Sequence, residues 1–486
     1  MSGATSGTTA PPPGAPPVRA AGWKVAVAYG MPNFGLAIMV GPVMGILQGY
    51  YAKHFPISLE AIAGVLLLAR VFDAVTDPLV GIASDHVRDR FWGRRSWLVV
   101  GALLSVLAMY NLLVVPDGVT VGSFRVWILV GFLAWTIAEI PYLAWGTELT
   151  GDYDARTRIF SSKTAWGFVG SLIFLALPNL IAFYQARVMG TPEAQITRDY
   201  SHLSMKASFW LLAVTTPLFV AIALWACPGG SHARKAERKG LAETARILFS
   251  NKAMRIFMGG FVVLGIAGGM QVAMAYLHVS VYLGLGEHVS QIYVVGFLCS
   301  LLGVPLWNWL AAAKGKHVSL IAGLSVTCFL FIGLGLLKPH DGVSLLWGKP
   351  VVFWYYLLIF CGCNFSQVVF YSMPPAIIGD ISEAALLETR KDQSATYYSV
   401  YTFLYKMMIG LGQGAALFLS GALFGFDPKA VAQVDKAAIG IKVIMGYLPA
   451  VLVVVAVLIL TRYPITRRRH LEIQARIKEL GLKVEE

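Results

Sequence analysis

Long apolar windows recur along almost the whole chain, and they constrain the fold more than any other feature. Each is 20 or more residues long, enough for a helix to cross a bilayer. Hydrophobic residues make up 57% of the sequence and charged residues 13%, which fits a chain surrounded largely by lipid. The twelve windows lie at 24–51, 60–84, 96–115, 124–147, 162–186, 207–227, 254–283, 289–312, 317–337, 350–378, 396–424 and 440–461.

A polar, basic stretch interrupts the windows after the sixth. Lipid offers no hydrogen-bond partner to the backbone, so windows of this length can cross the membrane only as helices. The sequence therefore predicts an all-α membrane protein with twelve transmembrane helices in two six-helix bundles. We expect an N-terminal bundle at 23–227, a cytoplasmic linker at 228–252 and a C-terminal bundle at 253–462.

The net charge of +13 is concentrated in alternate loops between the windows. Such loops lie in the cytoplasm under the positive-inside rule, so topology explains the charge without a nucleic-acid partner. We expect a multi-pass plasma-membrane protein, in the inner membrane if bacterial, with both termini cytoplasmic. The basic residues are Arg88, Arg90, Arg94 and Arg95; Arg234, Lys235, Arg238, Lys239 and Arg246; Lys314 and Lys316; and Arg467, Arg468 and Arg469.

The two ends of the chain differ from the windows in composition. Residues 1–22 are rich in Pro, Gly, Ala and Thr and contain no apolar segment, which predicts a disordered cytoplasmic tail. In the other tail, 463–486, Ile473, Ile477 and Leu480 recur at helical spacing among charges. This spacing predicts a short amphipathic helix on the membrane surface.

The sequence contains no pattern typical of an enzyme. The five cysteines are scattered through apolar windows and are interpreted as packing residues. No run of His, Cys or Glu has metal-site spacing, and neither a phosphate-binding glycine loop nor a nucleophile elbow is present. We expect no catalytic activity and no cofactor.

Two aspartates, Asp73 and Asp77, lie one helical turn apart inside the second window. A charged residue at membrane depth costs about 2.5 to 3.5 kcal/mol, and like charges at i and i+4 face each other on a helix. The pair therefore requires a cation or protons. Alternatively, Arg70, three residues earlier, neutralises one acid in a buried ion pair.

Charged and aromatic residues also occur in later windows. Trp135, Glu139 and Tyr142 are spaced by four and three residues, which predicts one helix face lining a cavity. Lys406 is a lone lysine followed by apolar residues. It either faces the two acids across the cavity or extends its amine to the headgroups.

Six motifs together resemble the glycoside-pentoside-hexuronide:cation symporters of the major facilitator superfamily, over nearly the whole chain. The helix 2 motif is the most specific of them. The motifs are Asp73-Ala-Val-Thr-Asp77-Pro78, Thr136-Ile-Ala-Glu139-Ile-Pro141-Tyr142, Asp152-Tyr-Asp-Ala-Arg156-Thr-Arg158, Pro375-Ala-Ile-Ile-Gly-Asp380, Lys406 and Arg462-Tyr-Pro-Ile-Thr-Arg-Arg-Arg-His470.

The resemblance implies a coupling-cation site formed by Asp73, Asp77 and Thr136, with Thr76 in the place of an asparagine. Carboxylate and hydroxyl oxygens suit Na⁺, which would make Asp73, Asp77 and Thr136 metal ligands. A pair of carboxylates could equally hold a proton. The sequence leaves Na⁺ and H⁺ open as the coupling ion.

The resemblance also implies a sugar site, although the sequence departs from the family there. Glu139 matches the family's acidic sugar-binding residue, Lys163 matches its arginine, and Asn33 matches its helix 1 acid. Leu143 replaces the stacking tryptophan, for which Trp135 could substitute. An ion pair between Glu139 and Lys163 without a substrate role is the alternative. The substrate-binding candidates are Glu139, Lys163, Asn33, Trp135, Tyr142 and Lys406, with Tyr50, Tyr51, Asn364 and Gln367 as further lining residues.

A last set of residues resembles the loop 2–3 motif of the superfamily, which acts as a conformational gate. Plain topogenic charge would explain its arginines but not its glycine and aspartate spacing. The set comprises Gly81, Asp85, Gly93, Arg94 and Arg95.

Together these features predict a symporter that moves a sugar or glycoside with Na⁺ or H⁺ by alternating access. Its partners would be a small-molecule substrate, most simply a glycoside, and membrane lipid. One alternative is a cation-coupled transporter of an amphiphile such as a lysolipid. Another is a membrane binding or scaffold protein that does not transport.

Overall fold

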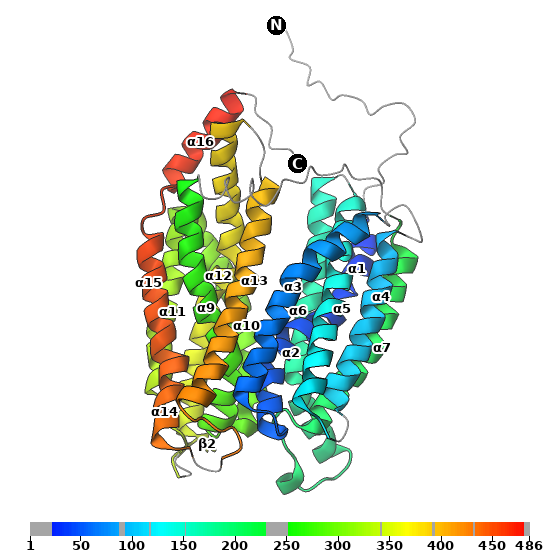
Figure 1. The fold of residues 1–486 in the computed structure, drawn as a ribbon, viewed down its shortest axis with the longest axis vertical. Helices are drawn as coiled ribbons and strands as arrows, with labels where there is room; N and C mark the ends of the chain where they lie inside the picture. The colour runs from blue at the N-terminus through cyan, green and yellow to red at the C-terminus, as the bar shows by residue number, and fades with distance from the viewer. Residues whose placement is uncertain are drawn as a thin grey trace.

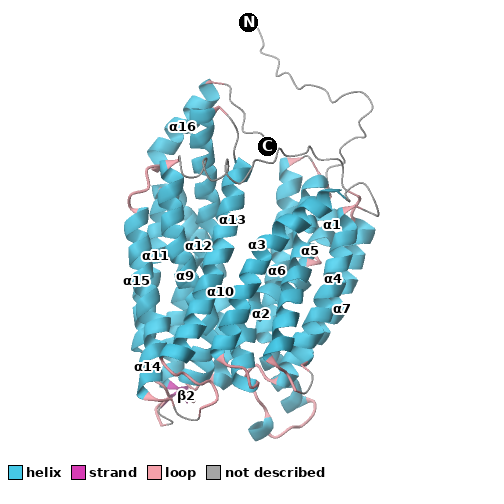
Figure 2. Cartoon of the chain, in the orientation of Figure 1, coloured by secondary structure: helices cyan, strands magenta, loops and turns pink. Residues whose placement is uncertain are grey.

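The computed structural model describes residues 22–86, 93–115, 118–150, 152–229, 251–340, 343–390, 394–430 and 433–480. The predicted N-terminal tail and most of the predicted linker lie outside these ranges. Within them, long helices form two groups that stand side by side (Figures 1 and 2).

The N-terminal group contains seven helices. They are α1 (Trp23–Gly30), α2 (Asn33–His54), α3 (Leu59–His86), α4 (Arg94–Met109), α5 (Val121–Glu148), α6 (Tyr153–Arg187) and α7 (His202–Ala226). The C-terminal group is formed by α9 (Lys252–Leu277), α10 (Val289–Lys314), α11 (Lys316–Leu336), α12 (Val351–Thr389), α13 (Ser394–Phe418), α14 (Asp435–Lys442) and α15 (Leu448–Leu460), and α16 (Arg467–Glu479) follows.

Short elements extend or connect these helices. Four π-helical turns are η1 (Tyr110–Val114), η3 (His278–Tyr282), η5 (Leu419–Leu423) and η6 (Val443–Tyr447). Two 3₁₀ turns are η2 (Glu193–Gln195) and η4 (Gly286–His288), and an antiparallel hairpin pairs β1 (Leu345–Leu346) with β2 (Lys349–Pro350).

Eleven helical segments in the described ranges are long and apolar enough to cross a membrane. The twelfth predicted crossing is α3, which is absent from the eleven because Arg70, Asp73 and Asp77 lie close together in it. Its 28 residues span about 42 Å, enough to cross a bilayer. The prediction of an all-α membrane protein with two six-helix bundles is confirmed.

Several helices extend beyond the apolar windows that predicted them. Helix α6 begins at Tyr153 rather than near 162, because the Asp152 carboxylate accepts a hydrogen bond from the Ala155 N–H at 2.6 Å. Helix α12 continues from the predicted end near 378 to Thr389. Hydropathy detects only the part of a helix inside lipid, so polar first and last turns were not predicted.

Apolar side chains are exposed along the outer surfaces of both groups, where a soluble protein would bury them. Leu302 is 69% exposed, Phe329 75% and Leu358 73%. Lipid would cover these residues. Polar and charged side chains are instead buried between helices. Arg70, Asp73, Thr136 and Lys163 are among them.

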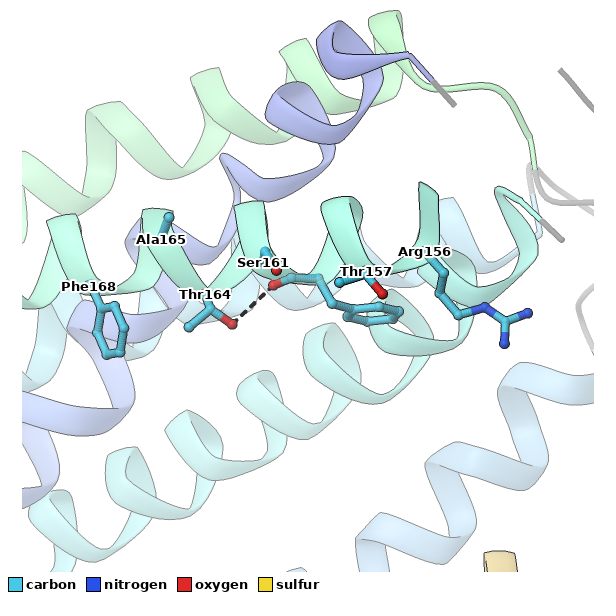
Figure 3. A pocket seen from close by; sticks show the side chains of 7 residues that line it. Arg156, Thr157, Ser161, Thr164, Ala165 and Phe168 are labelled. Atoms are coloured by element: carbon cyan, nitrogen blue, oxygen red, sulfur yellow. Dashed lines mark hydrogen bonds between the residues drawn. The ribbon is translucent and has the colours of Figure 1, made fainter. Parts of the chain in front are cut away.

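The two groups contact each other along the middle and C-terminal parts of α6. Near its C-terminus, the Asn179 Nδ2 donates to Ser290 Oγ on α10 at 2.7 Å, and nearer the middle the rings of Phe168 and Phe297 lie 5.8 Å apart. The N-terminal part borders a 580 Å³ groove whose lining side chains all belong to α6, from Arg156 to Phe168 (Figure 3). The groups are therefore joined at one end and separated at the other.

Asp199, in the segment between η2 and α7, joins the two groups at the closed end. Its Oδ2 accepts from Lys53 Nζ of α2 at 2.6 Å and from Ser280 Oγ of η3 at 2.8 Å. Its Oδ1 accepts from the Tyr276 hydroxyl of α9 at 3.0 Å. The same segment bonds Glu287 of η4 through the backbone N–H of Arg198 at 2.7 Å.

Helix α16 lies at the open end, against α12 (Figure 1). It begins three residues after Pro464, in the tail where an amphipathic helix is predicted. Ile473 is buried, whereas Leu480 is 46% exposed just beyond the last turn. His470 Nδ1 lies 3.4 Å from Asp380 Oδ1, so α16 contacts the end of α12 through polar as well as apolar groups.

Candidate functional site

A 570 Å³ cavity lies between the two groups and contains the acids predicted to bind a cation. It is bordered by α3 and α5 on one side and α13 on the other. Figure 1 shows α3 and α13 side by side at the border between the groups, where Gly410 and Gly414 of α13 lie against Arg70 and Leu67 of α3. The lining includes Arg70, Asp73, Asp77, Trp135, Glu139, Leu143, Tyr398, Thr402, Phe403 and Lys406.

Asp77 connects three helices and both halves of the molecule. Its Oδ1 accepts from Thr136 Oγ1 of α5 at 2.8 Å. Its Oδ2 lies 2.7 Å from Lys406 Nζ of α13, so this ion pair crosses from the N-terminal to the C-terminal half. Lys406 also lies over the Trp135 ring, 4.7 Å from its centroid. The lysine therefore faces the acids rather than the headgroups.

Asp73 is paired with the arginine that precedes it on α3. Arg70 Nη1 lies 3.1 Å from Asp73 Oδ2, and both residues are buried. The predicted alternative of an ion pair is thus what the structure shows for this acid. The second oxygen, Asp73 Oδ1, is buried and has no hydrogen-bond partner among the described residues.

The cluster can supply the ligands of a hard cation. Two carboxylates and the Thr136 hydroxyl offer oxygens, and Arg70 and Lys406 balance the two negative charges when no ion is bound. Among the described residues, no group of three or more His, Cys, Asp and Glu side chains is arranged so that it could hold a metal ion. Thr76 does not line the cavity, and its hydroxyl donates to the Phe72 carbonyl at 3.0 Å.

Glu139 and Lys163 form an ion pair between α5 and α6. Lys163 Nζ lies 2.7 Å from Glu139 Oε1, as the alternative interpretation of this pair predicts. Glu139 borders the cavity, and its Oε2 is buried without a partner in the described part of the chain. Lys163 is buried behind it and does not border the cavity.

Two predicted substrate-binding residues are used in packing instead. Asn33 Nδ2 donates to the Lys163 carbonyl at 2.8 Å. The Tyr142 hydroxyl donates to the Tyr29 carbonyl, and Tyr29 donates to the Tyr142 carbonyl at 2.7 Å. Neither residue borders the cavity. The cavity face of α5 therefore includes Trp135 and Glu139 of the predicted face but not Tyr142.

That face consists of Trp135, Glu139 and Leu143, at spacings of four. The same spacing on α13 aligns Tyr398 and Thr402 with Lys406, and the sequence analysis missed both of these residues. Counting back from Lys406 in steps of four would have found them.

The four further lining candidates separate into two pairs. Tyr50 and Tyr51 are fully buried, and the Tyr51 hydroxyl donates to the Leu112 carbonyl at 3.0 Å. Asn364 and Gln367 border a second cavity of 380 Å³, which lies between α2 and α6 on one side and α9, α10 and α12 on the other.

The predicted gating residues make their contacts within the N-terminal half. Arg94 Nη2 lies 2.9 Å from Asp85 Oδ1, and its Nε lies 3.0 Å from Glu148 Oε1. Arg95 donates to a carbonyl of α7 and lies over the Trp145 ring. Gly81 faces open space, and Gly93 has a φ of +61°, in the left-handed region that favours glycine.

Known proteins resemble this chain in both sequence and fold. The family model described as MFS/sugar transport protein matches residues 26–467. An uncharacterized symporter of Synechocystis sp., sll1374, is 26% identical, covering 93% of this chain and 96% of its own. A sodium-dependent lysophosphatidylcholine symporter, 1-B, of Danio rerio is 22% identical, covering 83% of this chain and 80% of its own.

Among solved structures, the nucleoside transporter NupG has a TM-score of 0.61 at 14% identity. The match covers 90% of this chain and all of that one. This likeness supports the fold, and the family match spans both helix groups. The chain therefore belongs to the MFS/sugar transport protein family and has the major facilitator fold.

Proposed function

We propose that this protein is a cation-coupled symporter of a sugar or glycoside. The observation that carries the proposal is the ion pair between Asp77 and Lys406, which joins the two halves inside the cavity. A cation that binds Asp77 must displace this lysine or share the carboxylate with it. Cation occupancy would thus change a contact between the halves, as coupling requires.

The coupling ion would bind to Asp73, Asp77 and Thr136. Na⁺ would be held by the Asp77 oxygens, by Asp73 Oδ1, which has no described partner, and by the Thr136 hydroxyl. A proton would bind one carboxylate and release its basic partner. An ion or proton that takes Asp77 from Lys406 would free the lysine to approach the substrate.

The sugar would contact the α5 face next to this site. Glu139 would accept a hydrogen bond from a sugar hydroxyl through Oε2, while Lys163 holds its other oxygen. Trp135 would offer an apolar ring face beside Lys406. Asn33 and Tyr142 would act indirectly, by fixing the helices that carry Lys163 and Glu139.

The protein would lie in the plasma membrane. The open end of its cavity would face the cytoplasm. Arg94, Arg95 and the basic residues of α16 lie at that end, where the positive-inside rule places them. The structure would then be the inward-open state. The gating residues would control how the N-terminal half meets the C-terminal half when this end closes.

Transport of a lysolipid is the second candidate, and two observations favour it. The cavity wall includes Leu143, Phe403 and Met407, an apolar surface unlike a typical sugar site. Several relatives carry the name sodium-dependent lysophosphatidylcholine symporter. A scaffold that does not transport would have no need of a charge pair between its halves.

Charge movement in proteoliposomes on a solid-supported membrane tests the proposal. The probes are methyl α-D-galactopyranoside, methyl β-D-glucopyranoside and lysophosphatidylcholine, each added in Na⁺ buffer and in Na⁺-free acidic buffer. A glycoside-evoked current that needs one of these ions supports sugar symport and identifies the ion. A response to the lysolipid alone supports the second candidate, and silence with every probe counts against both.

A further inference from the structure

The β1–β2 hairpin between α11 and α12 exposes apolar side chains at the closed end of the molecule. In Figure 1 it lies at the end opposite to α16. Val343, just before β1, is 82% exposed, Leu345 is 62% exposed and Trp347 is 80% exposed. Apolar side chains that gather on an exposed surface mark a contact with a membrane or with another protein.

The tip of the hairpin has an unusual backbone for its sequence. The strands pair Leu346 with Lys349, so Trp347 and Gly348 form a two-residue turn. Both have positive φ, +51° and +73°, as a type I′ turn requires. Asn, Asp or Gly is preferred at the first of these positions, because a bulky side chain is strained there. A tryptophan that tolerates this strain indicates that its ring has a role beyond forming the turn.

Hydrogen bonds hold the hairpin against two neighbouring helices. Trp354 Nε1 of α12 donates to the Leu346 carbonyl at 2.9 Å, and the rings of Trp347 and Trp354 lie 5.2 Å apart. Lys349 is the one charged residue of 343–350, and its Nζ donates to Gln291 Oε1 of α10 at 2.6 Å. The hairpin therefore presents its apolar side chains from a fixed position, with its charge engaged by the protein.

The surface next to the hairpin faces lipid. Leu336, the last residue of α11, is 65% exposed, and Tyr355 and Leu358 of α12 are 59% and 73% exposed. The apolar window at 350–378 begins where the hairpin ends, so the hairpin lies at the boundary of the apolar layer. Tryptophan is enriched at this boundary, because its ring is apolar and its N–H is polar.

We propose that hairpin 345–350 inserts into the headgroup region of the membrane at the closed end, with Trp347 as its anchor. The partner is the apolar boundary of a phospholipid leaflet rather than a charged headgroup, since Lys349 is engaged by Gln291. Because the hairpin is bonded to both α10 and α12, lipid contact there would hold the C-terminal half at this leaflet.

The test measures the depth of the hairpin with a spin label at Leu345→Cys in the full-length protein, with the five native cysteines replaced. The vesicles are of phosphatidylcholine, with or without added phosphatidylglycerol. Collisions of the label with O₂, which concentrates in the apolar layer, are compared with collisions with a water-soluble nickel chelate. Leu358→Cys on the outer surface of α12 is the lipid reference, and Gln195→Cys at an exposed position of η2 is the water reference.

Trp347→Asn in the labelled protein tests the anchor, because asparagine suits the turn but lacks the ring. Trp347→Tyr is the matched control, since tyrosine keeps an aromatic ring with a polar group. Equal or higher thermal unfolding temperatures in detergent would show that both variants are folded.

We expect the ratio of O₂ to nickel collisions at Leu345→Cys to exceed that at Gln195→Cys about fivefold, because the label lies at the membrane boundary. The ratio should be the same in both kinds of vesicle. It should fall about threefold in Trp347→Asn and persist in Trp347→Tyr, because only the latter keeps an interfacial side chain.

A ratio at Leu345→Cys equal to that at Gln195→Cys would place the hairpin in water and overturn the proposal. A high ratio that requires phosphatidylglycerol would overturn the assignment to an uncharged lipid boundary. An unchanged ratio in Trp347→Asn would exclude Trp347 as the anchor. Dipolar broadening between labels of two copies would show instead that a second copy of the chain covers the hairpin.

Discussion

At the residue scale, function depends on which partner each buried charge takes. Arg70 holds Asp73 within one helix, whereas Lys406 holds Asp77 across the two halves. The Arg70–Asp73 pair is buried, so removing one partner leaves the other charge uncompensated, whereas Asp77 and Lys406 are each about a quarter exposed. Asp77, whose partner can move away with the other half, is the acid better placed for exchange with a cation.

Substituting Lys406 by glutamine should tighten cation binding while abolishing coupling. The amide keeps most of the side-chain volume but no longer competes for Asp77, so cation affinity should rise about tenfold, equivalent to about 1.4 kcal/mol. Quenching of tryptophan fluorescence, with Trp135 beside the site, measures the affinity. Lys442→Gln, on α14 away from the cavity, is the control. Weaker cation binding in Lys406→Gln would contradict the exchange of Lys406 for a cation at Asp77.

Thr136 provides a second substitution at this scale. Thr136→Val removes the hydroxyl bonded to Asp77 but keeps the shape, so Na⁺ affinity should fall about tenfold, equivalent to about 1.4 kcal/mol. Thr136→Ser should retain the affinity. Thr402→Val is the control, because that hydroxyl borders the same cavity but donates to its own helix at 2.9 Å. Equal Na⁺ titrations of Thr136→Val and wild type would remove Thr136 from the site.

At the element scale, the closed end combines packing between transmembrane helices, α6 with α10 and α2 with α9, with the polar contacts of one short segment. The Asp199 carboxylate accepts hydrogen bonds from α2, α9 and η3. Contacts of this segment therefore help to hold the two halves together near the contact between α6 and α10. Because these contacts are polar and few, changing one of them should alter the balance between states more than it alters folding.

We expect Asp199→Asn to shift the protein toward a conformation open at this end. The asparagine side chain cannot form the ion pair with Lys53. Its oxygen can still accept hydrogen bonds, but its NH₂ group cannot. Spin labels at Gln195→Cys and Val343→Cys, with the five native cysteines replaced, report the separation of the halves by double electron–electron resonance. The longer-distance population should grow at least threefold.

Glu193→Gln is the matched control for this experiment. Glu193 lies in η2, directly before this segment, and its ion pair with Arg198 does not join the halves. Its distance distribution should equal that of the wild type. A growth of the longer-distance population in Glu193→Gln equal to that in Asp199→Asn would mean that the Asp199 contacts have no special role.

At the scale of the whole molecule, hydropathy and loop charge predicted the number and order of the helices. Their lengths were underestimated, because the polar turns of α6 and α12 outside lipid have no apolar signal. The second crossing was predicted correctly although its charges exclude it from a strict hydropathy criterion. The position of those charges inside an apolar window, before any family resemblance, already predicted a site for a cation or protons.

The site was predictable where one helix carries a motif and less so where several helices must meet. One cavity is bordered by Asp73, Asp77, Trp135, Glu139 and Lys406. Lys406 lies there although nearly 270 residues separate it from Glu139 in sequence. Asn33 and Tyr142 do not border this cavity. Their side chains instead bond backbone carbonyls of neighbouring helices, α6 for Asn33 and α1 for Tyr142. No periodicity within a single helix reveals which neighbour covers a given face.

The proposed coupling requires a cation to bind at Asp77 in exchange for Lys406. The most direct test is the current evoked by a Na⁺ or H⁺ concentration jump, without substrate, in proteoliposomes of wild type and Asp77→Asn. Asp435→Asn, at the start of α14 outside the cavity, is the control. We predict a saturable current in the wild type and the control, and its loss in Asp77→Asn. A saturable current of wild-type size in Asp77→Asn would contradict the account.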